Sequence, residues 1–404
     1  MAGIRTKESP FTPGKPVPIE YFVARGKEIE RLERAIRQTA SGRNENVFIT
    51  GERGIGKSSL ASFVRYLGEK EFSFVGAHCF LGGVADLEGM MRVIFQRLLQ
   101  EVTDRSVFEK LKGIFDRYIK GLTLFGVGVE FTKDRSELRT LVENFLPALR
   151  RIQESIKDQK SGLLLVLDDL NGITGVREFA LFLKSFVDEL ATSGDSLRLL
   201  LMLVGIPERR DDLTRHQPSV ARIFDVVHLR PMAESESTEF FGRTFGGQNI
   251  KVSPDALSLM VEFSGGLPML MHEVGDAVFW QDTDNSIDGG DAARGIFDTA
   301  ENVGKKYLDP RVYRALRGQS YRSILRRIGK LPLGSSFHRQ DVLGMLPDKE
   351  RKTFDNFLRR IKGMGVIAEG EVRGEYRFVN DLFHLYIQLE AHRAEKESRS
   401  PNKA

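Results

Sequence analysis

The chain has 404 residues, of which 41% are hydrophobic, and a formal net charge of +4 at pH 7. This length predicts two or three domains with packed cores, and so small a net charge indicates no class of partner by itself. The single cysteine, Cys79, excludes an intramolecular disulfide and a thiolate metal site, and no apolar run is long enough for a membrane span or a signal peptide. We therefore expect a cytoplasmic protein without a membrane partner.

The first residues predict a flexible N-terminal arm over 1–18, because four prolines fall within them. A helical pattern follows at 26–38, and then a short apolar strand at 46–50. Directly after this strand, the segment Gly51-Glu52-Arg53-Gly54-Ile55-Gly56-Lys57-Ser58 fits the phosphate-binding pattern G-x-x-x-x-G-K-[ST]. Residues 58–67 continue with helical spacing, so the pattern lies between a strand and a helix, as its chemistry requires.

This segment predicts binding of a nucleoside triphosphate with Mg²⁺. Glycines let several backbone N–H groups point at phosphate oxygens, and the following helix adds the positive end of its dipole. Lys57 is expected to neutralise the β- and γ-phosphates, and the Ser58 hydroxyl to ligate Mg²⁺. Nothing like the guanine-reading N-K-x-D pattern follows, so ATP is the expected nucleotide. The remaining predicted nucleotide contacts of the loop are Gly51, Glu52, Arg53, Gly54, Ile55, Gly56 and Ser59.

Further apolar runs at 72–79, 163–167, 197–204 and 226–229 alternate with helical patterns such as 87–99 and 179–190. This alternation predicts an α/β core with a doubly wound parallel sheet over residues 19–231. The run at 163–167 lacks any polar residue, which is typical of a central strand, and Asp168 and Asp169 follow at the strand end where such sheets bind ligands. We assign Asp168 to Mg²⁺, and Asp169 to orienting or deprotonating the attacking water.

Residues 104–145 form an insertion that a minimal α/β unit does not need, with an amphipathic stretch at 108–119 and a glycine-spaced apolar run at 121–131. We interpret the apolar run as a hairpin. Packing on the domain edge and contact with a partner are both open as its role.

After residue 231 helical patterns dominate, at 234–245, 255–263, 267–280 and 291–303, which predicts a small helical lid domain over 232–317. Three helical patterns at 321–328, 340–346 and 350–364, followed by a hairpin at 366–379, predict a winged helix over 318–392. Residues 393–404 are polar and predict a flexible tail.

The winged helix carries the basic excess of the chain, because residues 318–404 hold 17 Lys and Arg against 11 Asp and Glu. The third helix of this domain, at 350–364, could enter a DNA major groove, while basic residues on or beside it and in the hairpin contact the phosphates. Three acidic residues interrupt the series of basic residues: Asp348, Glu350 and Asp355. Contact with a protein and autoinhibitory packing therefore stay open as alternatives to duplex DNA binding. The basic residues concerned are Lys349, Arg351, Lys352, Arg359, Arg360, Lys362, Arg373 and Arg377.

Together these motifs are similar to those of AAA+-related and STAND-type P-loop ATPases, a group that includes origin-recognition initiators, archaeal-type ATPases, transposition regulators and defence ATPases. The segment 21–29, with Arg25, resembles the stretch that borders the adenine in this group, although Ala24 replaces the usual glycine. Asp168 and Asp169 resemble the STAND acidic pair. The segment 265–268 resembles the lid element G-G-L-P, which implies that Pro268 lies near the base.

Two departures from the resemblance predict slow hydrolysis. The strand that ends near residue 204 continues with Gly205 and Ile206, where many relatives carry a polar γ-phosphate sensor, and Pro268 stands near the place of a lid sensor arginine. Arg222 resembles the arginine that a neighbouring subunit supplies in oligomeric relatives, which would make activity depend on assembly into a homo-oligomer. A surface or helix-capping role is the alternative for Arg222.

Two functions follow from this combination. The first is an ATP-controlled switch, in which nucleotide state governs assembly and engagement of DNA or of a separately encoded partner or effector. The second is a DNA-binding protein in which ATP is mainly structural. A metabolic kinase is disfavoured, because a kinase with this loop needs no winged helix.

Overall fold

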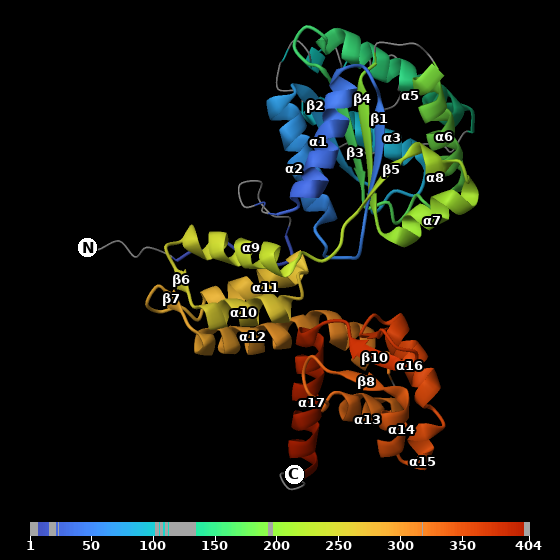
Figure 1. The fold of residues 1–404 in the computed structure, drawn as a ribbon. Coiled ribbons are helices and arrows are strands. Elements are labelled where there is room, and N and C mark those ends of the chain that lie inside the picture. Colours follow the sequence, from blue (N-terminus) through green and yellow to red (C-terminus); the bar gives the residue numbers. More distant parts are fainter. Residues whose placement is uncertain are drawn as a thin grey trace. The chain divides into compact units, whose positions relative to one another are not determined.

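The computed structural model describes residues 7–15, 22, 24–101, 105, 108–109, 112, 135–192, 197–316 and 318–399 (Figure 1). The chain divides into two compact units, Pro16–Arg230 and a second made of Met1–Lys15 with Pro231–Ala404. It therefore passes between the units twice, once after Lys15 and once after Arg230. The glycine-rich hairpin predicted at 121–131 lies outside the described residues.

The unit Pro16–Arg230 is built on a five-stranded parallel sheet in the order β2-β3-β4-β1-β5. The α/β fold with a doubly wound parallel sheet is thus confirmed. Strand β4 lies between β1, which leads into the phosphate loop, and β3, which ends in the acidic pair. The strands are β1 (Glu45–Thr50), β2 (Phe74–Phe80), β3 (Gly162–Asp168), β4 (Leu199–Gly205) and β5 (Asp225–His228).

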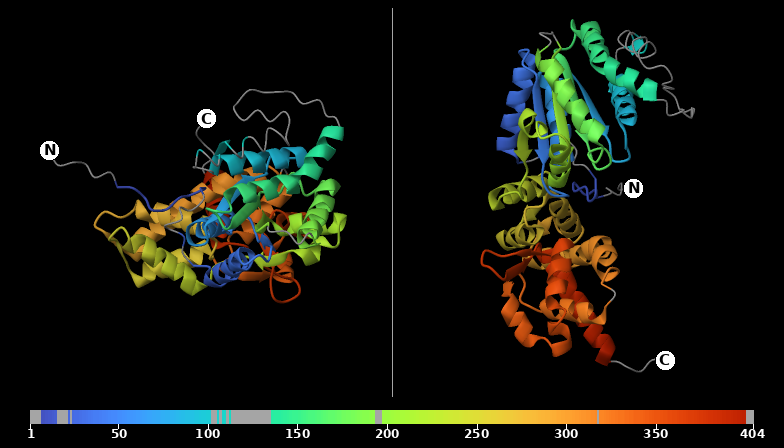
Figure 2. Two further views of the ribbon diagram at one scale, coloured as in Figure 1. Left: turned by 90° about the horizontal axis from the view of Figure 1, so that it is seen from above. Right: turned by 90° about the vertical axis from the view of Figure 1, so that its right-hand side faces the viewer.

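Helices cover both faces of this sheet, as the side view in Figure 2 shows. One face carries α1 (Gly26–Ala40) and α2 (Lys57–Glu71). The other carries α3 (Leu87–Glu101), α5 (Arg135–Ile156) and α6 (Arg177–Thr192). Two short helices, α7 (Pro207–His216) and α8 (Val220–Ile223), connect β4 to β5.

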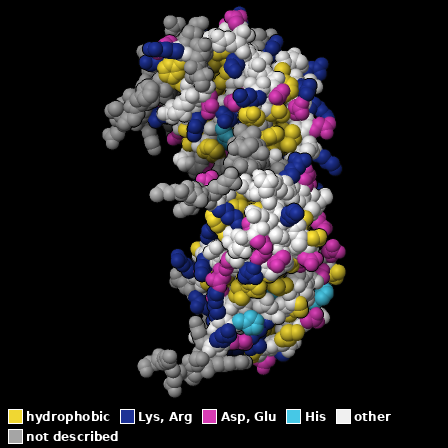
Figure 3. Space-filling model, turned by 90° about the vertical axis from the view of Figure 1, so that its left-hand side faces the viewer, with side chains coloured by type: hydrophobic (Ala, Val, Ile, Leu, Met, Phe, Trp, Pro, Cys, Tyr) yellow, Lys and Arg dark blue, Asp and Glu magenta, His cyan; other side chains and the backbone are white. Residues whose placement is uncertain are grey.

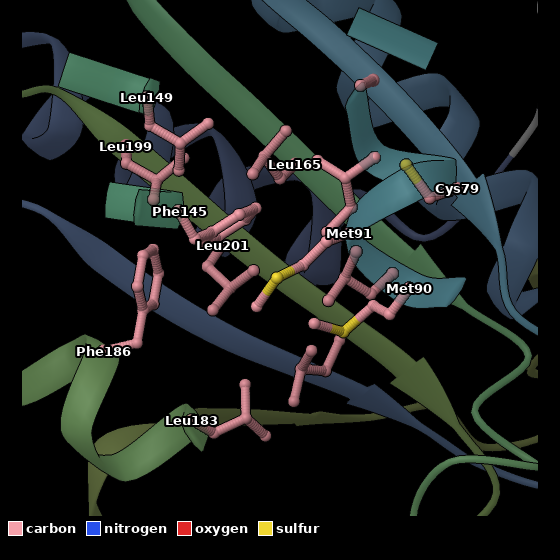
Figure 4. Close-up of a cluster of buried hydrophobic side chains, with 14 of the residues drawn as sticks. Cys79, Met90, Met91, Phe145, Leu149, Leu165, Leu183, Phe186, Leu199 and Leu201 are labelled. Carbon is pink, nitrogen blue, oxygen red and sulfur yellow. The ribbon is translucent and has the colours of Figure 1, made fainter. Parts of the chain in front are cut away.

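Strand β3 is apolar from Leu163 to Leu167 because both of its faces are covered. Leu163, Leu165 and Leu167 belong to the core cluster on the side of α3, α5 and α6. Leu164 points the other way, where Gly68 of α2 leaves room for its side chain. Figure 4 shows the first of these layers, in which Leu165 and Leu201 face Phe145, Met90 and Met91. Cys79 lies in the same cluster, and burial raises the pKa of its thiol to about 12.

The second unit begins with four helices, α9 (Glu234–Gly246), α10 (Pro254–Ser264), α11 (Pro268–Phe279) and α12 (Gly289–Val303). Two short parallel strands, β6 (Lys251–Val252) and β7 (Ser286–Ile287), pair between them. A π-helix, η2 (Gly304–Tyr313), leads out of α12. These elements are the predicted helical lid.

The winged helix follows in the same unit. Its elements are α13 (Gln319–Ile328), β8 (Ser336–His338), α14 (Arg339–Met345), α15 (Asp348–Arg351), α16 (Phe354–Gly363), β9 (Ile367–Glu369), β10 (Glu375–Phe378) and α17 (Asp381–Arg399). The three strands form an antiparallel sheet in the order β8-β10-β9. Helix α17 packs against α12 and α10 of the lid, so lid and winged helix share one body.

One helix differs from the prediction. The pattern at 350–364 predicts a single helix, whereas the chain breaks between α15 and α16 at Thr353. The Thr353 hydroxyl donates to the Glu350 carbonyl at 3.0 Å, a local hydrogen bond that competes with helix continuation. The break also lets Phe354 enter the core, where it is fully buried.

The N-terminal segment differs as well, because residues 7–15 pack instead of forming a free arm. The Phe11 ring is 4% exposed and lies 5.0 Å from the Phe245 ring, over Gly275, whose missing Cβ makes the contact possible. The Thr12 backbone N–H donates to Nδ1 of His272 at 3.2 Å, and Lys7 pairs with Asp282 at 2.7 Å. The prolines predict an unpacked segment, but burial of the Phe11 side chain on the lid contributes about 2 kcal/mol and holds the segment in place.

Within the part of the chain that the structure describes, no helix is both long and apolar enough to cross a membrane.

Candidate functional site

The predicted phosphate loop has backbone geometry that needs glycine. Gly51, Gly54 and Gly56 have φ angles of 153°, 79° and 90°. A Cβ on Gly51 would lie 2.7 Å from the Leu229 carbonyl oxygen, so no larger residue fits. Helix α2 begins directly after Gly56, and no side chain caps its N-terminus. Its first N–H groups and the positive end of its dipole are left to bind an anion.

Lys57 lies at the start of this helix with its side chain folded over the loop. Its Nζ donates to the carbonyls of Gly51 at 2.9 Å and of Glu52 at 2.7 Å. Burial lowers the pKa of Lys57, and the carboxylate of Asp168 acts in the opposite direction. The ammonium is therefore held among oxygen acceptors at the loop, close enough to Asp168 for the two charges to interact.

Asp168 ends strand β3 and is 3% exposed. Its Oδ1 accepts the backbone N–H of Asp169 at 2.7 Å, and its Oδ2 lies 2.9 Å from Nε2 of His78. His78 is also buried, and its Nδ1 lies 3.1 Å from the Ser62 hydroxyl on α2. Sequence reasoning missed both His78 and Ser62, because one histidine in an apolar strand has no local signature.

Asp169 differs from its neighbour in both backbone and surroundings. It is exposed and has a left-handed φ of 55°, a conformation that Asp tolerates better than most residues. Its carboxylate accepts from the Asn171 side-chain amide and lies against Gly82, where a Cβ would come within clashing distance. The turn thus directs the second carboxylate away from the buried network of the first.

The two oxygen donors that the sequence predicts for Mg²⁺, Ser58 and Asp168, would suit this ion better than a metal held wholly by protein. Among the described residues, no cluster of three or more His, Cys, Asp or Glu could enclose a metal ion. One hydroxyl, Ser58, and one carboxylate, Asp168, leave the other positions to water and phosphate oxygens, which is how Mg²⁺ is usually bound.

Arg25 supports the phosphate loop through hydrogen bonds to backbone carbonyls. Its guanidinium is 4% exposed and donates to the carbonyls of Arg230 at 2.6 Å and of Ile55 at 3.1 Å. Both Ala24 and Arg25 have positive φ angles, of 71° and 67°, which explains why glycine suits the position of Ala24. Arg25 thus ties the loop to the end of β5, while its contact with nucleotide stays a prediction. Tyr21 and Val23 of the same motif lie outside the described residues.

The end of β4 carries no polar side chain that reaches toward the loop, as the sequence predicts. Gly205 pairs with Thr50, the last residue before the loop, and Ile206 begins the turn into α7. The next cation, Arg209, pairs with Asp212 at 2.7 Å.

Arg222 and Pro268 lie on other elements. Arg222 is exposed on α8, and its side chain forms no ion pair or hydrogen bond with any described residue. Pro268 is the first residue of α11, in the second unit. The roles assigned to both residues stay predictions.

The G-G-L-P turn at 265–268 lies against the segment that follows Arg230 and close to the start of α17. Gly265 and Gly266 have φ angles of 57° and 67°, and a Cβ on Gly266 would lie 2.3 Å from the Met232 carbonyl oxygen. The Met232 N–H in turn donates to the Gly266 carbonyl at 2.8 Å. Just before this turn, the Phe263 carbonyl accepts a hydrogen bond from Nδ2 of Asn380 at 3.4 Å, while Oδ1 of Asn380 accepts the Leu382 N–H at the start of α17. The turn and the end of α10 therefore bring the connection after Arg230 and the start of α17 together.

Helix α16 of the winged helix is amphipathic. Its buried face comprises Phe354, Phe357, Leu358 and Ile361. The exposed face carries Arg359, Arg360 and Lys362. Arg360 donates to the Ala315 carbonyl at 3.0 Å and Lys362 pairs with Glu369 at 2.6 Å, whereas Arg359 pairs with no described residue.

The acidic residues that interrupt this basic series are engaged within the domain. Asp355 accepts two hydrogen bonds from Arg339, at 2.6 and 2.8 Å. Glu350 is buried and lies 3.2 Å from Arg327. Asp348 is exposed and lies 3.6 Å from Arg351. Figure 3 shows that basic and acidic side chains are mixed over the face of the molecule that it displays.

Parts of the chain are similar in sequence to known proteins. Residues 21–213 match the family described as AAA ATPase domain, a range that includes the phosphate loop and the acidic pair. An uncharacterized HTH-type transcriptional regulator of Methanocaldococcus jannaschii is 23% identical over an alignment of 288 residues, which covers 66% of each chain. The chain thus spans just under two thirds of that relative's length.

Two solved structures share the fold over nearly the whole chain. The Walker-type ATPase of Pyrococcus abyssi has a TM-score of 0.55 and 18% identity, covering 91% of this chain and 97% of that one. The ORC2 protein of Aeropyrum pernix, solved as ADPNP and ADP complexes, has a TM-score of 0.58 and 14% identity, covering 97% and 98%. At these identities the likeness shows the fold alone.

Proposed function

We propose that this chain, whose residues 21–213 form an AAA ATPase domain, is a slow ATPase that uses its nucleotide state to control DNA binding by its winged helix. Assembly into a homo-oligomer on ATP binding is part of this proposal. The DNA-binding part of the proposal is supported by the similarity to an HTH-type transcriptional regulator and by the exposed basic face of α16.

The proposed chemistry divides among the residues of the first unit. The loop N–H groups and Lys57 would hold the triphosphate, and Ser58 with Asp168 would hold Mg²⁺, which neutralises charge that develops on the phosphates. Asp169, exposed at the end of β3, would orient the attacking water. The absence of a polar group at the end of β4 supports a slow basal rate, which Arg222 of a neighbouring copy would raise.

One observation carries the link between ATP and DNA. Helix α17 of the winged helix packs on α10 and α12 of the lid, and Asn380 joins its start to the end of α10, just before the G-G-L-P turn. The winged helix therefore packs with the lid in one compact unit. Any nucleotide-dependent movement of the lid against the ATPase core would reorient α16 as well.

The DNA contact is expected on the exposed face of α16. Arg359 is the cation of that face with no internal ion pair among described residues, and exposed Lys349 and Lys352 lie just before the helix. Arg373 and Arg377 are exposed in the hairpin and would reach the backbone beside it. Because Asp355 and Glu350 are paired internally, they oppose a phosphate backbone less than their positions in the sequence suggest.

The test is duplex-DNA affinity, measured by fluorescence anisotropy without nucleotide, with ADP, and with a non-hydrolysable ATP analogue. We expect the three states to differ, and Lys57→Ala to bind DNA at the nucleotide-free affinity under all conditions. Arg359→Ala should weaken binding and lower the salt slope by about one. Its matched control is Arg243→Ala on α9, an exposed arginine already paired with Glu239.

Equal DNA affinity in the three nucleotide states would instead favour the second candidate, a DNA-binding protein in which ATP only stabilises the fold. Absence of duplex binding in every state would remove DNA from the proposal and favour a protein partner for the winged helix.

A further inference from the structure

The carboxylate of Asp168 is held by a chain of hydrogen-bonded side chains that reaches back to helix α2. Oδ2 of Asp168 lies 2.9 Å from His78 Nε2, and His78 Nδ1 lies 3.1 Å from the Ser62 hydroxyl. Asp168 is 3% exposed and His78 is 7% exposed. These residues come from β3, β2 and α2, three elements that the sheet topology brings together.

The hydrogen-bond roles in this chain follow from chemistry. An ionised carboxylate only accepts, so a neutral imidazole carries its proton on Nε2, and its Nδ1 accepts from the Ser62 hydroxyl. The Phe80 ring lies 4.5 Å from the imidazole and nearly parallel to it, which limits rotation of the ring. Oδ1 of Asp168 accepts the Asp169 N–H at 2.7 Å. Each carboxylate oxygen therefore has one donor, and its plane is fixed.

The position of Ser62 gives this arrangement a function. Ser62 follows Ser58 by four residues on α2, so the two hydroxyls lie on the same helix face, one turn apart. Ser58 and Asp168 are the two protein groups that the proposed function assigns to Mg²⁺. The path Ser62–His78–Asp168 thus connects the helix of one ligand to the strand of the other.

We propose that His78, oriented by Ser62, is a positioning residue that presents the Asp168 carboxylate to Mg²⁺. His78 does not contact nucleotide or reacting atoms in this proposal, which rests on the proposed ATP and Mg²⁺ site. Partners of this kind, one step removed from a metal, commonly change metal affinity or activity by about 10- to 100-fold when removed.

The test measures ATP binding by isothermal titration with and without Mg²⁺, and turnover in parallel. Removing the donor in His78→Leu should leave affinity without Mg²⁺ unchanged and reduce the Mg²⁺-dependent gain in affinity by about 10- to 100-fold. His78→Gln places an amide N–H close to the position of Nε2, so it should recover most of that gain. His216→Leu on α7, in the same unit, is the matched control and should behave as the parent.

Two further variants separate positioning from a purely structural role. Ser62→Ala removes one hydroxyl and should reduce the Mg²⁺-dependent gain in ATP affinity, though by less than His78→Leu does. This variant keeps the proposal testable if His78→Leu fails to fold. In an Asp168→Asn background, His78→Leu should have no further effect on the gain, because the two residues act as one unit.

Unchanged Mg²⁺ dependence in folded His78→Leu and Ser62→Ala, or equal losses in His78→Leu and His78→Gln, would overturn the role of His78. Additive effects of the Asp168 and His78 variants would overturn it as well. If the parent chain itself shows no Mg²⁺-dependent gain, the proposed ATP and Mg²⁺ site fails first, and this role fails with it.

Discussion

Two buried histidines should make the second unit sensitive to acid. His272 lies among the rings of Phe11 and Phe240, and His384 is stacked on Phe378 with ring centroids 4.0 Å apart. Burial lowers the pKa of each histidine from 6.5 to about 4. Below pH 6.5 the unfolded chain takes up protons that the folded unit does not, so the free energy of unfolding falls as pH falls toward 4. Above pH 6.5 both states are neutral and the two histidines contribute nothing.

The size of the effect follows from these pKa values. At pH 5 each histidine lowers the free energy of unfolding by about 2 kcal/mol, and the two together by about 4 kcal/mol if they act independently. With a urea slope of about 2 kcal/mol per molar, the unfolding midpoint of this unit should fall by about 2 M between pH 7 and pH 5. Unfolding measurements at or above about pH 5 keep Asp282 and Asp355 ionised, because the lowered pKa values of these two carboxyl groups place their titration below this range.

The chain provides a specific probe for this measurement. Its one tryptophan, Trp280, lies at the end of α11 in the same unit as both histidines, so its fluorescence follows unfolding of that unit. The double variant His272→Gln/His384→Leu should have a nearly constant urea midpoint between pH 7 and pH 5. The exposed His338 supplies the control His338→Gln, which should keep the parental pH dependence. A parental midpoint that changes by less than about 0.5 M would refute the reasoning, since it corresponds to only about 1 kcal/mol.

The remaining predictions concern the ATPase site. Lys57→Ala should abolish ATP binding without unfolding the chain, whereas Lys70→Ala, an exposed lysine at the other end of α2, should not; calorimetry and circular dichroism check both. Asp169→Asn should retain ATP and lose turnover, and phosphate release at the parental rate would exclude its role toward water. Specific activity should rise with protein concentration, and Arg222→Ala should lower turnover at unchanged ATP affinity. Mixing the Arg222→Ala and Asp169→Asn proteins should restore some activity, and a rate indifferent to concentration and to Arg222 would eliminate the arginine in trans. ATP should compete better than GTP for the site, and equal competition would mean that the base is barely read.

The sequence by itself determined the phosphate loop and the order of the elements around it. The glycines at 51, 54 and 56 specify a backbone that other residues cannot adopt without strain, and Lys57 and Ser58 follow them in the same short segment. The unbroken apolar run before Asp168 likewise indicated a central strand, because only a strand covered on both faces needs no polar side. Such signals are local, so they can be recognised without knowing the fold.

Only the tertiary structure decided which distant residues meet. His78 and Asp168 are separated by 90 positions, and they pair because β2 and β3 lie side by side in one register. Phe11 docks on the lid, although the prolines around it predict an unpacked arm. Arg25, assigned to the nucleotide by resemblance, donates to two carbonyls of the loop region. In each case the deciding free energy comes from burial or from a hydrogen bond between segments distant in sequence, and these depend on a neighbour that the local sequence does not specify.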